Sequence, residues 1–317
     1  MEDIDNKGES DDKEVLLWQK VIKQTKNENV ENSNSKSIKD LMKKHIKSLE
    51  NKEYLKKVIR TGFENLDGII GGFLPGELIV IGGRPGMGKT QFLVNLTMKI
   101  SEQVPVLYVN NELSEQALAF RFISLLADVD LSIVYNNELE KEEKERIKML
   151  ETSKKNNSVF IHHEYHLHVH RFESICRKPI EDGVKVIFLD YLQLLVSEKS
   201  SEEREEAMSY VIRELKKLAR EKEVCVVVSS QLSRNVEYRG GAKRPELYDL
   251  RDGGAIEEEA DKVLLLYRPE YYNITYDENG EPNDGLTELI VAKNKNGKLG
   301  YAKLKVDDSF IHFTDKE

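Results

Sequence analysis

Short apolar runs alternate with amphipathic stretches between residues 59 and 307. The apolar runs have the length of buried strands, which are predicted at Leu78–Ile81, Val106–Val109, Ser158–His162, Val184–Leu189, Val224–Ser229, Lys262–Leu266, Glu288–Ala292 and Tyr301–Val306. Apolar residues three and four positions apart predict helices at Thr90–Ser101, Ser114–Asp128, Lys141–Lys155, His170–Asp182 and Glu202–Lys222. The early strands are continuously apolar, whereas the last two alternate around a turn at Asn296-Gly297. The pattern predicts an α/β fold with a mostly parallel sheet, flanked by helices and carrying an antiparallel edge hairpin.

The first 58 residues have a different pattern. Residues 1–35 are acidic and polar, with too few apolar side chains to form a core, and are predicted to be disordered. Ser37 and Asp40 then have capping-box spacing, followed by an apolar stripe made of Ile38, Leu41, Met42, His45, Ile46 and Leu49. A lone helix of this length is marginally stable in water, so its stripe is expected to pack on its own core or on a neighbouring subunit.

The composition is that of a soluble protein. The 317 residues carry a formal net charge of −9, and no apolar run approaches the length of a membrane-spanning helix. The acidic N-terminus does not resemble a signal peptide, and Cys176 and Cys225 are the only cysteines, so we expect a cytoplasmic protein with reduced thiols. The negative charge argues against a basic surface over the whole protein but leaves room for a local basic loop that contacts nucleic acid.

A phosphate-binding motif lies between the first predicted strand and the first predicted helix of the α/β region. It reads Gly83-Arg84-Pro85-Gly86-Met87-Gly88-Lys89-Thr90 and fits the P-loop pattern G-x-x-x-x-G-K-[ST]. Glycines let consecutive backbone N–H groups face one anion at the positive end of the helix dipole. Lys89 would reach the β- and γ-phosphates, and Thr90 would contribute a hydroxyl to Mg²⁺. The motif predicts binding of a nucleoside triphosphate with Mg²⁺.

Three polar residues end or follow other predicted strands, and in a parallel sheet all three would face the crevice that contains the P-loop. Asp190 ends an apolar strand, as expected for a carboxylate that holds Mg²⁺. Glu112 follows the strand Val106–Val109 and is a candidate general base, although a glutamate at the start of a helix is also favoured by the helix dipole. Gln231 follows the strand Val224–Ser229, where its amide can bind the γ-phosphate and sense its loss.

A basic segment, Ser233 to Arg251, comes directly after Gln231. Its positive residues are Arg234, Arg239, Lys243, Arg244 and Arg251, and Gly240-Gly241 makes it flexible. A position beside the nucleotide sensor suits contacts with a nucleic-acid backbone. The alternative is a solvated surface loop without a ligand.

Histidines gather in another stretch, because five of the seven lie between His162 and His170. Zinc ligation is one interpretation of such a cluster. However, no cysteine or further histidine lies at metal-binding spacing elsewhere, so a chance cluster in a strand-end loop is the expected explanation.

These motifs, taken in order, resemble the C-terminal motor domain of the DnaB-type replicative DNA helicases, which has a RecA-like fold. The resemblance covers roughly residues 36–314 and rests on TGFENLDGIIGGFLPGELIVIGGRPGMGKT, NNEL, IFLDYLQLL, SSQLSR, RPELYDLRDGGAIEEEAD and AKNKNG. It implies a ring, usually of six subunits, that moves 5′→3′ on single-stranded DNA by hydrolysing Mg-ATP, with a helicase loader as a further partner. After the segment 1–35, whose disorder is predicted from composition, the resemblance implies a linker helix, 36–58, that packs on the adjacent subunit, and a RecA-like ATPase motor domain, 59–317.

The resemblance also implies roles for individual residues. Glu112 matches the catalytic glutamate and Gln231 the phosphate-sensing glutamine, acting with Lys89. The DNA contacts are expected at Arg251, Asp252 and Gly254, with Arg234 and Arg244 as additional candidates in the basic segment. Lys293 and Lys295 match the hairpin that reaches the γ-phosphate of the neighbouring subunit.

Two departures from the family pattern leave a second function open. Lys295 stands where the family usually has arginine, and a lysine lacks the planar fork that arginine presents to phosphate. The first 35 residues have no counterpart of the helical collar that meets primase, so primase binding in the usual way is not expected. The alternative is a regulatory or adaptor ATPase that binds DNA without unwinding it, and a recombinase-like strand-exchange protein is a more distant third.

Overall fold

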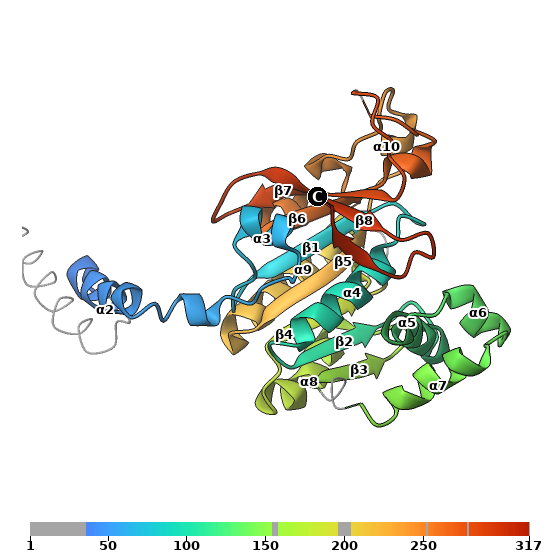
Figure 1. The fold of residues 1–317 in the computed structure, drawn as a ribbon. Helices are drawn as coiled ribbons and strands as arrows, with labels where there is room; N and C mark the ends of the chain where they lie inside the picture. Colours follow the sequence, from blue (N-terminus) through green and yellow to red (C-terminus); the bar gives the residue numbers. More distant parts are fainter. Residues whose placement is uncertain (1–35, 154–157, 196–203, 252, 278, 317) are drawn as a thin grey trace, which may run out of the picture. The chain divides into compact units, whose positions relative to one another are not determined.

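The computed structural model describes residues 36–153, 158–195, 204–251, 253–277 and 279–316 (Figure 1). The chain divides into one unit that ends at Lys56 and a second unit from Lys57 to Glu317. The predicted disordered segment, residues 1–35, lies outside the described residues. Within the described part of the chain, no helix is long and apolar enough to cross a membrane.

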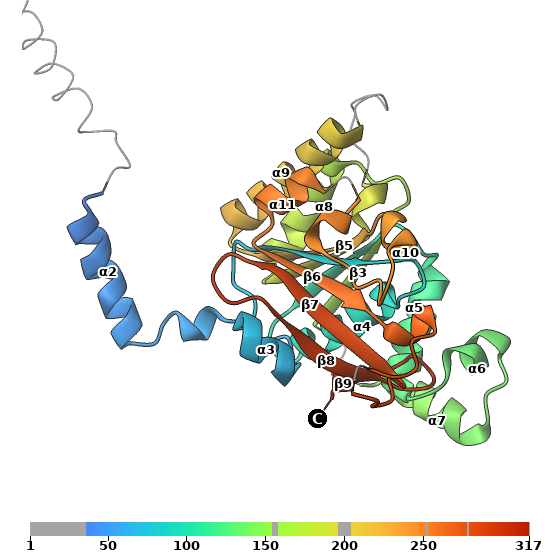
Figure 2. The ribbon, with the colours of Figure 1, turned by 90° about the horizontal axis from the view of Figure 1, so that it is seen from above.

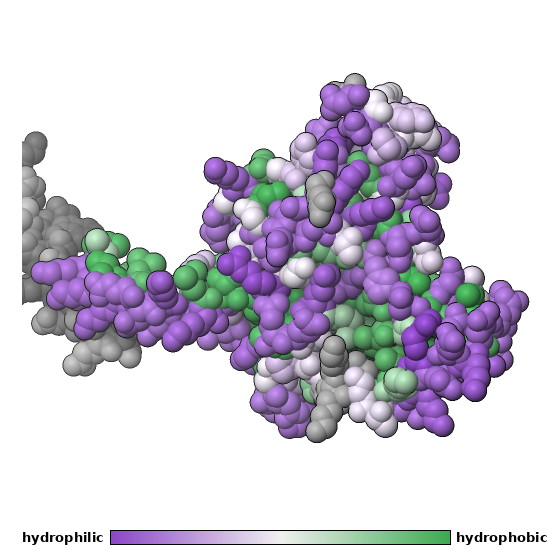
Figure 3. Space-filling view, in the orientation of Figure 1, coloured by the Kyte–Doolittle hydropathy of each residue, from purple (hydrophilic) through white to green (hydrophobic). Residues whose placement is uncertain are grey.

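The first unit contains the predicted capped helix, α2 (Ile38–Glu50). The Ser37 hydroxyl oxygen accepts a hydrogen bond from the Asp40 backbone N–H at 3.1 Å, which confirms Ser37 as the N-cap. The apolar stripe lies open to solvent, since Ile38 is 72% exposed and Leu49 is 67% exposed. Hydrophobic side chains are visible along this helix in Figure 3. A short 3₁₀ turn, Leu55–Lys57, follows.

The second unit is built on one sheet, whose described strands have the order β3-β2-β4-β5-β1-β6-β7-β8-β9. The strands that pair in parallel are β3 (Val159–His163), β2 (Val106–Asn110), β4 (Val186–Asp190), β5 (Cys225–Gln231), β1 (Leu78–Gly83) and β6 (Lys262–Tyr267). The strands that pair antiparallel at one side are β7 (Leu286–Asn294), β8 (Gly300–Val306) and β9 (Phe313–Asp315). The predicted α/β fold with a mostly parallel sheet and an antiparallel hairpin is therefore confirmed.

Helices cover both faces of this sheet (Figure 2). One face packs against α3 (Glu64–Ile70), α4 (Lys89–Ser101) and α5 (Glu115–Ala127). The other face packs against α8 (Val169–Glu181), α9 (Arg204–Lys222) and α11 (Gly254–Glu259). A smaller apolar cluster joins α5 to α6 (Leu131–Asn136) and α7 (Lys141–Leu150). Because both faces are covered, the central strands are fully buried, as their continuous apolar runs predicted.

The sequence pattern located the long elements and missed the short ones. Each predicted strand and helix of the motor region is present, with ends shifted by a few residues. The predicted helix Lys141–Lys155 is too long, because α7 ends at Leu150. The pattern missed β9 and four short helices, which are α3, α6, α10 (Asn235–Tyr238) and α11. A helix of four to seven residues makes at most about two turns, and a three-residue strand shows hardly any alternation, so neither establishes a hydrophobic period.

A buried ion pair joins the first and sixth strands of the parallel sheet at their amino ends. The Lys262 ammonium contacts both carboxylate oxygens of Glu77, and the two side chains are 2% and 6% exposed. Glu77 also accepts a hydrogen bond from the Leu74 backbone N–H at 2.9 Å. The pair therefore compensates two charges that the folded chain removes from water.

Replacing one partner of this pair should destabilise the second unit strongly. Lys262→Met leaves the Glu77 carboxylate buried without its cation, so we expect the free energy of unfolding to fall by about 3–5 kcal/mol. Denaturant unfolding followed by circular dichroism measures the loss. The double variant Glu77→Gln/Lys262→Met removes both charges and should recover part of it. A single-variant loss below about 1 kcal/mol would contradict the role given to the pair.

Candidate functional site

The P-loop joins β1 to α4 and has the backbone that the motif requires. Gly86 and Gly88 have φ angles of +80° and +94°, a region that L side chains rarely adopt. A Cβ on Gly83 would lie 3.0 Å from Lys89 Cγ, so a larger residue there would crowd the lysine. The Met87 side chain is buried in the hydrophobic core and attaches the loop to it. The loop is thus fixed around an open space at the N-terminus of α4.

Lys89 lies at the start of α4, close to two carboxylates. Its ammonium donates a hydrogen bond to the Arg84 carbonyl oxygen at 3.2 Å. Burial lowers the pKa of Lys89, and the negative charges of Asp190 and Glu112 act in the opposite direction. Lys89 lines the pocket, and the hydrogen bond that its side chain donates goes to a backbone carbonyl that a phosphate can replace.

Asp190 ends β4 and is almost completely buried. The Tyr108 hydroxyl on β2 donates to Asp190 Oδ2 at 3.0 Å, and the Ser229 hydroxyl on β5 donates to Oδ1. These bonds orient the carboxylate and satisfy its oxygens, since a buried polar group without hydrogen-bond partners is costly. Carboxylate and hydroxyl oxygens are the donors that Mg²⁺ prefers, so Asp190 together with Thr90 on the P-loop fits the predicted metal.

Glu112 follows β2 in a turn that Asn110 stabilises. The Asn110 side-chain oxygen accepts hydrogen bonds from the Glu112 and Leu113 backbone N–H groups at 3.3 and 3.0 Å. Burial raises the pKa of the Glu112 carboxyl, and the charge of Asp190 raises it further, while Lys89 and Arg121 lower it. A carboxylate whose pKa is raised is a stronger base, which suits the abstraction of a proton from water.

Gln231 ends β5 and lines the same pocket as Glu112 and Lys89. Its backbone N–H donates to the side-chain oxygen of Gln193 at 3.1 Å, and the Gln193 amide donates to the Ser230 hydroxyl at 2.8 Å. Its backbone carbonyl accepts the Arg251 N–H at 3.1 Å. The sequence analysis did not identify Gln193, although the residue stands three positions after Asp190 and so at the same edge of the sheet.

The P-loop opens into a pocket of about 430 Å³ that two further residues line. Arg268 follows β6, and its guanidinium carbon lies 4.1 Å from the centroid of the Phe310 ring. Burial lowers the pKa of Arg268, and Glu270 acts against this shift. Arg268 could have been found from the sequence, because it follows a strand at the same edge as the P-loop. Phe310 comes from a loop near the C-terminus and carries no such signal.

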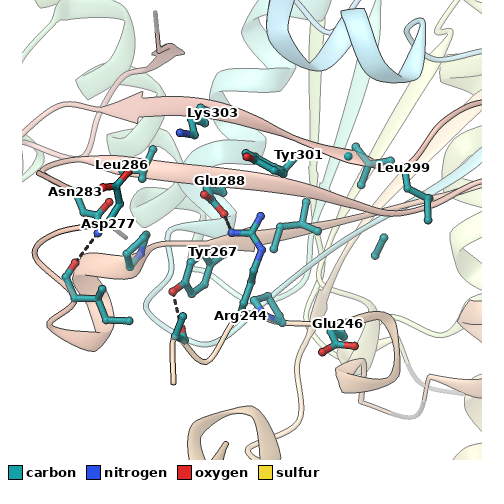
Figure 4. A pocket seen from close by; sticks show the side chains of 18 of the residues that line it. Arg244, Glu246, Tyr267, Asp277, Asn283, Leu286, Glu288, Leu299, Tyr301 and Lys303 are labelled. Carbon is teal, nitrogen blue, oxygen red and sulfur yellow. Dashed lines mark hydrogen bonds and ion pairs between the residues drawn. The ribbon is translucent and has the colours of Figure 1, made fainter. Parts of the chain in front are cut away.

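The predicted DNA-binding residues have different surroundings. Arg234 and Arg251 are exposed, and Gly254 opens α11, whereas Asp252 lies outside the described residues. Arg244 is turned into a groove of about 800 Å³ over β6, β7 and β8 (Figure 4). There it pairs with Glu288, between the rings of Tyr267 and Tyr301. The exposed pair therefore remains the better candidate for contacts with nucleic acid.

Lys293 and Lys295 lie at the opposite edge of the sheet from the P-loop. Lys293 is at the end of β7, opposite Val263 near the start of β6, and the strands are antiparallel. The Lys295 ammonium lies 3.2 Å from the Glu259 carbonyl oxygen and 3.6 Å from Asp261 Oδ1. In Figure 2 the turn between β7 and β8 lies at the opposite end of the sheet from α10. These lysines cannot reach the pocket of their own chain.

The histidine cluster and the cysteines lie outside the pocket. Within the described residues, no group of three or more His, Cys, Asp or Glu side chains could hold a metal ion. His162 pairs with Glu164, and His163 contacts the Asn110 amide at 3.0 Å. Cys176 and Cys225 are both buried as free thiols.

Comparisons with known proteins give the family of this chain. Residues 58–315 match the family model of the DnaB-like helicase C terminal domain. A probable replicative DNA helicase of Trieres chinensis is 38% identical over 262 residues, which cover 81% of this chain and 57% of that protein. Replicative DNA helicase DnaB of Geobacillus stearothermophilus is 34% identical over 289 residues, which cover 89% and 62%. The chain thus spans 57% to 62% of the length of these relatives.

Solved structures give the same result for the fold. One solved structure, an ATPase domain, superposes with a TM-score of 0.80 at 28% identity, covering 90% of this chain and 100% of that one. A DnaB-like replicative helicase, described with its interactions with primase, superposes with a TM-score of 0.79 at 25% identity, covering 97% and 77%. These likenesses confirm the RecA-like fold that the motifs predicted.

The Arg268–Phe310 contact should hold the base of a bound nucleotide. A base that stacks on either group gains about 1–3 kcal/mol, so Arg268→Ala or Phe310→Ala should weaken ATP binding about 5- to 150-fold. Binding of tripolyphosphate, which has no base, should stay within about twofold of wild type. Titration of a fluorescent ATP analogue and of tripolyphosphate measures both constants. Tyr276→Ala, an exposed aromatic of the other groove, is the control, and equal losses for both ligands would refute the assignment.

Proposed function

Because this chain belongs to the family of DnaB-like helicase C-terminal domains, we propose that it is the ATP-driven motor of a DNA helicase. In this proposal the helicase is a ring of six subunits that moves 5′→3′ on single-stranded DNA. The observation that carries the proposal is that Lys89, Glu112 and Gln231 line one pocket beside the P-loop, while the buried Asp190 lies close enough to act on the pKa of both Lys89 and Glu112. The groups of that pocket are those that phosphoryl transfer to water needs: a cation, a metal carboxylate, a base and a phosphate sensor.

Each residue has a proposed part in hydrolysis. The P-loop N–H groups and Lys89 bind the phosphates, and Thr90 with Asp190 holds Mg²⁺, which supplies charge neutralisation on the phosphates when bound. Glu112 orients the attacking water and accepts its proton, for which its raised pKa is suited. The Gln231 amide binds near the γ-phosphate and changes its contacts when that group leaves.

Lys293 and Lys295 complete the site of a neighbouring copy in this proposal. At about 3.3 Å per residue, the four steps from Val263 to Tyr267 put Lys293 about 13 Å from the P-loop edge of its own chain. A head-to-tail contact between copies would instead bring this edge to the next pocket, and repeated contacts of that kind close a ring. A lysine pair then neutralises the charge that develops on the γ-phosphate, as point charges rather than a planar fork.

The exposed stripe of α2 supports assembly in the same way. A capped helix whose apolar residues are open to solvent gains stability only when those residues are covered. We propose that the neighbouring subunit covers them. The DNA partner is proposed to contact Arg251, Gly254 and Arg234, with the backbone link from Gln231 to Arg251 joining the sensor to the DNA contact. The mature protein is proposed to act in the cytoplasm, with a helicase loader as a partner.

The proposal predicts ATP hydrolysis that single-stranded DNA stimulates and that Glu112→Gln abolishes. The variant removes the base and keeps the size of the side chain, so we expect turnover to fall about 10²- to 10⁴-fold while ATP affinity changes little. Steady-state phosphate release, nucleotide titration and strand separation on a forked duplex are the measurements. Two results together would instead indicate the regulatory ATPase. ATP turnover would not change when DNA is added, and light scattering would show a monomer in the presence of an ATP analogue and DNA.

The acid limb of the pH–rate profile tests the same residue. A general base works as the carboxylate, so turnover is present above the pKa of Glu112 and is lost as the pH falls through it. Since burial and Asp190 raise this pKa, the limb should lie above the usual range of a glutamate. Arg121 lowers the pKa of Glu112, so Arg121→Gln should move the limb to higher pH. A limb that stays in place in that variant would assign it to another group.

Mixing two inactive variants tests whether Lys295 acts between chains. Lys295→Ala has an intact pocket but no Lys295 to offer the pocket of its neighbour. Glu112→Gln has a defective pocket but an intact Lys295. In a randomly mixed head-to-tail ring, about a quarter of the interfaces combine an intact pocket with an intact Lys295, so ATPase activity should return to about that level. Glu112→Gln mixed with Lys89→Ala, two defects of the same pocket, is the control and should stay inactive. No recovery in the test mixture would rule out a role between chains.

A further inference from the structure

Arg84, the second residue of the P-loop, directs its side chain toward α10. Both its Nε and one terminal nitrogen lie 2.7 Å from Glu237 Oε1, and the other terminal nitrogen donates to the Leu232 carbonyl oxygen at 2.8 Å. The Arg84 side chain is only 10% exposed. A nearly buried guanidinium that donates a hydrogen bond to a carboxylate and also forms an ion pair with it makes a strong and directional contact. It joins the phosphate loop to the segment that follows Gln231.

The segment that receives this contact is braced internally. Arg239 donates to Asp249 Oδ1 at 2.7 Å and to the Arg244 carbonyl oxygen at 2.8 Å. The Ser233 backbone N–H donates to the Asp249 carbonyl oxygen at 2.7 Å. These bonds connect the start, middle and end of the basic segment, so a displacement of α10 would be transmitted to Asp249 and to the backbone at Arg244, while the Arg244 side chain keeps its ion pair with Glu288.

The other end of Arg84 is engaged with the nucleotide site. Its carbonyl oxygen accepts the hydrogen bond from the Lys89 ammonium, and also one from the Met87 N–H at 3.2 Å. Phosphate binding draws a P-loop lysine onto the β- and γ-oxygens. The Arg84 carbonyl then loses its cationic partner while the Arg84 side chain still holds Glu237. One residue therefore connects the occupancy of the pocket with the position of α10.

We infer that Arg84 and Glu237 form a latch through which a bound nucleotide sets the position of the basic segment, Ser233 to Arg251, and so its hold on DNA. The inference rests on the proposed function, because that segment is the proposed DNA contact. Glu237 is then a positioning residue: it touches neither nucleotide nor DNA and acts through Arg84. A purely structural ion pair would affect stability and leave the coupling between the two ligands intact.

Amide hydrogen exchange tests the latch without DNA. A non-hydrolysable ATP analogue with Mg²⁺ should slow exchange in the P-loop and change it in the basic segment of the wild-type chain. In Glu237→Ala the P-loop response should remain and the basic-segment response should disappear. Glu246→Ala is the matched control, since Glu246 lies in the same segment, pairs with Arg239 and is 61% exposed. Glu237→Gln keeps a hydrogen-bond acceptor for Arg84, so the exchange response of its basic segment should lie between those of the wild type and Glu237→Ala. This variant also keeps the test informative if the alanine variant misfolds.

DNA affinity with and without the analogue gives the functional readout. The wild-type ratio of dissociation constants should lie in the range of about 5–150-fold that is typical of coupled sites. In Glu237→Ala the ratio should fall to within about twofold of one, with the ATPase rate in the absence of DNA unchanged. The latch is overturned if Glu237→Ala keeps the wild-type ratio of dissociation constants. It is also overturned if the ATP analogue does not change hydrogen exchange in the basic segment of the wild-type chain. If the wild-type chain does not bind DNA at all, the proposed function fails, and the exchange experiment still decides the latch.

Discussion

The buried carboxylate of Asp190 is the group on which the rest of the site depends. It ends a central strand and accepts hydrogen bonds from Tyr108 on β2 and Ser229 on β5, the two neighbouring strands. A buried carboxylate without such donors is costly, so the register of the three strands must be kept for both oxygens to have partners. The charge of Asp190 raises the pKa of Glu112 and acts on Lys89. A constraint of the fold thus sets the chemistry of the pocket.

The sequence predicted the parts of the site that obey a local rule. Asp190, Glu112 and Gln231 could be located because each ends or follows an apolar strand and parallel strands end at one edge of the sheet. The α/β fold followed from the same runs. The resemblance to a known family then assigned roles that spacing alone left open for Glu112, and those roles remain proposals.

The remaining residues could not be predicted because their partners are far away in the sequence. Gln193 donates a hydrogen bond to Ser230, which is 37 positions further on, and Phe310 contacts the guanidinium of Arg268. Arg84 occupies a variable position of the P-loop pattern, and its partner Glu237 is 153 positions away. No periodicity or spacing rule relates such pairs, since only the packed sheet brings them together. The short helices and β9 were missed for a simpler reason, because one or two helical turns, or a strand of three residues, carry almost no hydrophobic period.

The direction of one strand decides whether the site is completed within the chain or between chains. β1 lies between β5 and β6, so the P-loop and the strand ends that bear Gln231 and Arg268 share an edge. β7 pairs with β6 in the antiparallel sense and therefore returns the chain to the end of the sheet where the parallel strands begin. There the Lys293 and Lys295 side chains donate hydrogen bonds to carbonyl groups at the end of α11. A parallel β7 would have ended beside the P-loop and brought these lysines to their own nucleotide. With β7 reversed, their charges can act on a phosphate only in a second copy, so under the proposed function hydrolysis requires assembly.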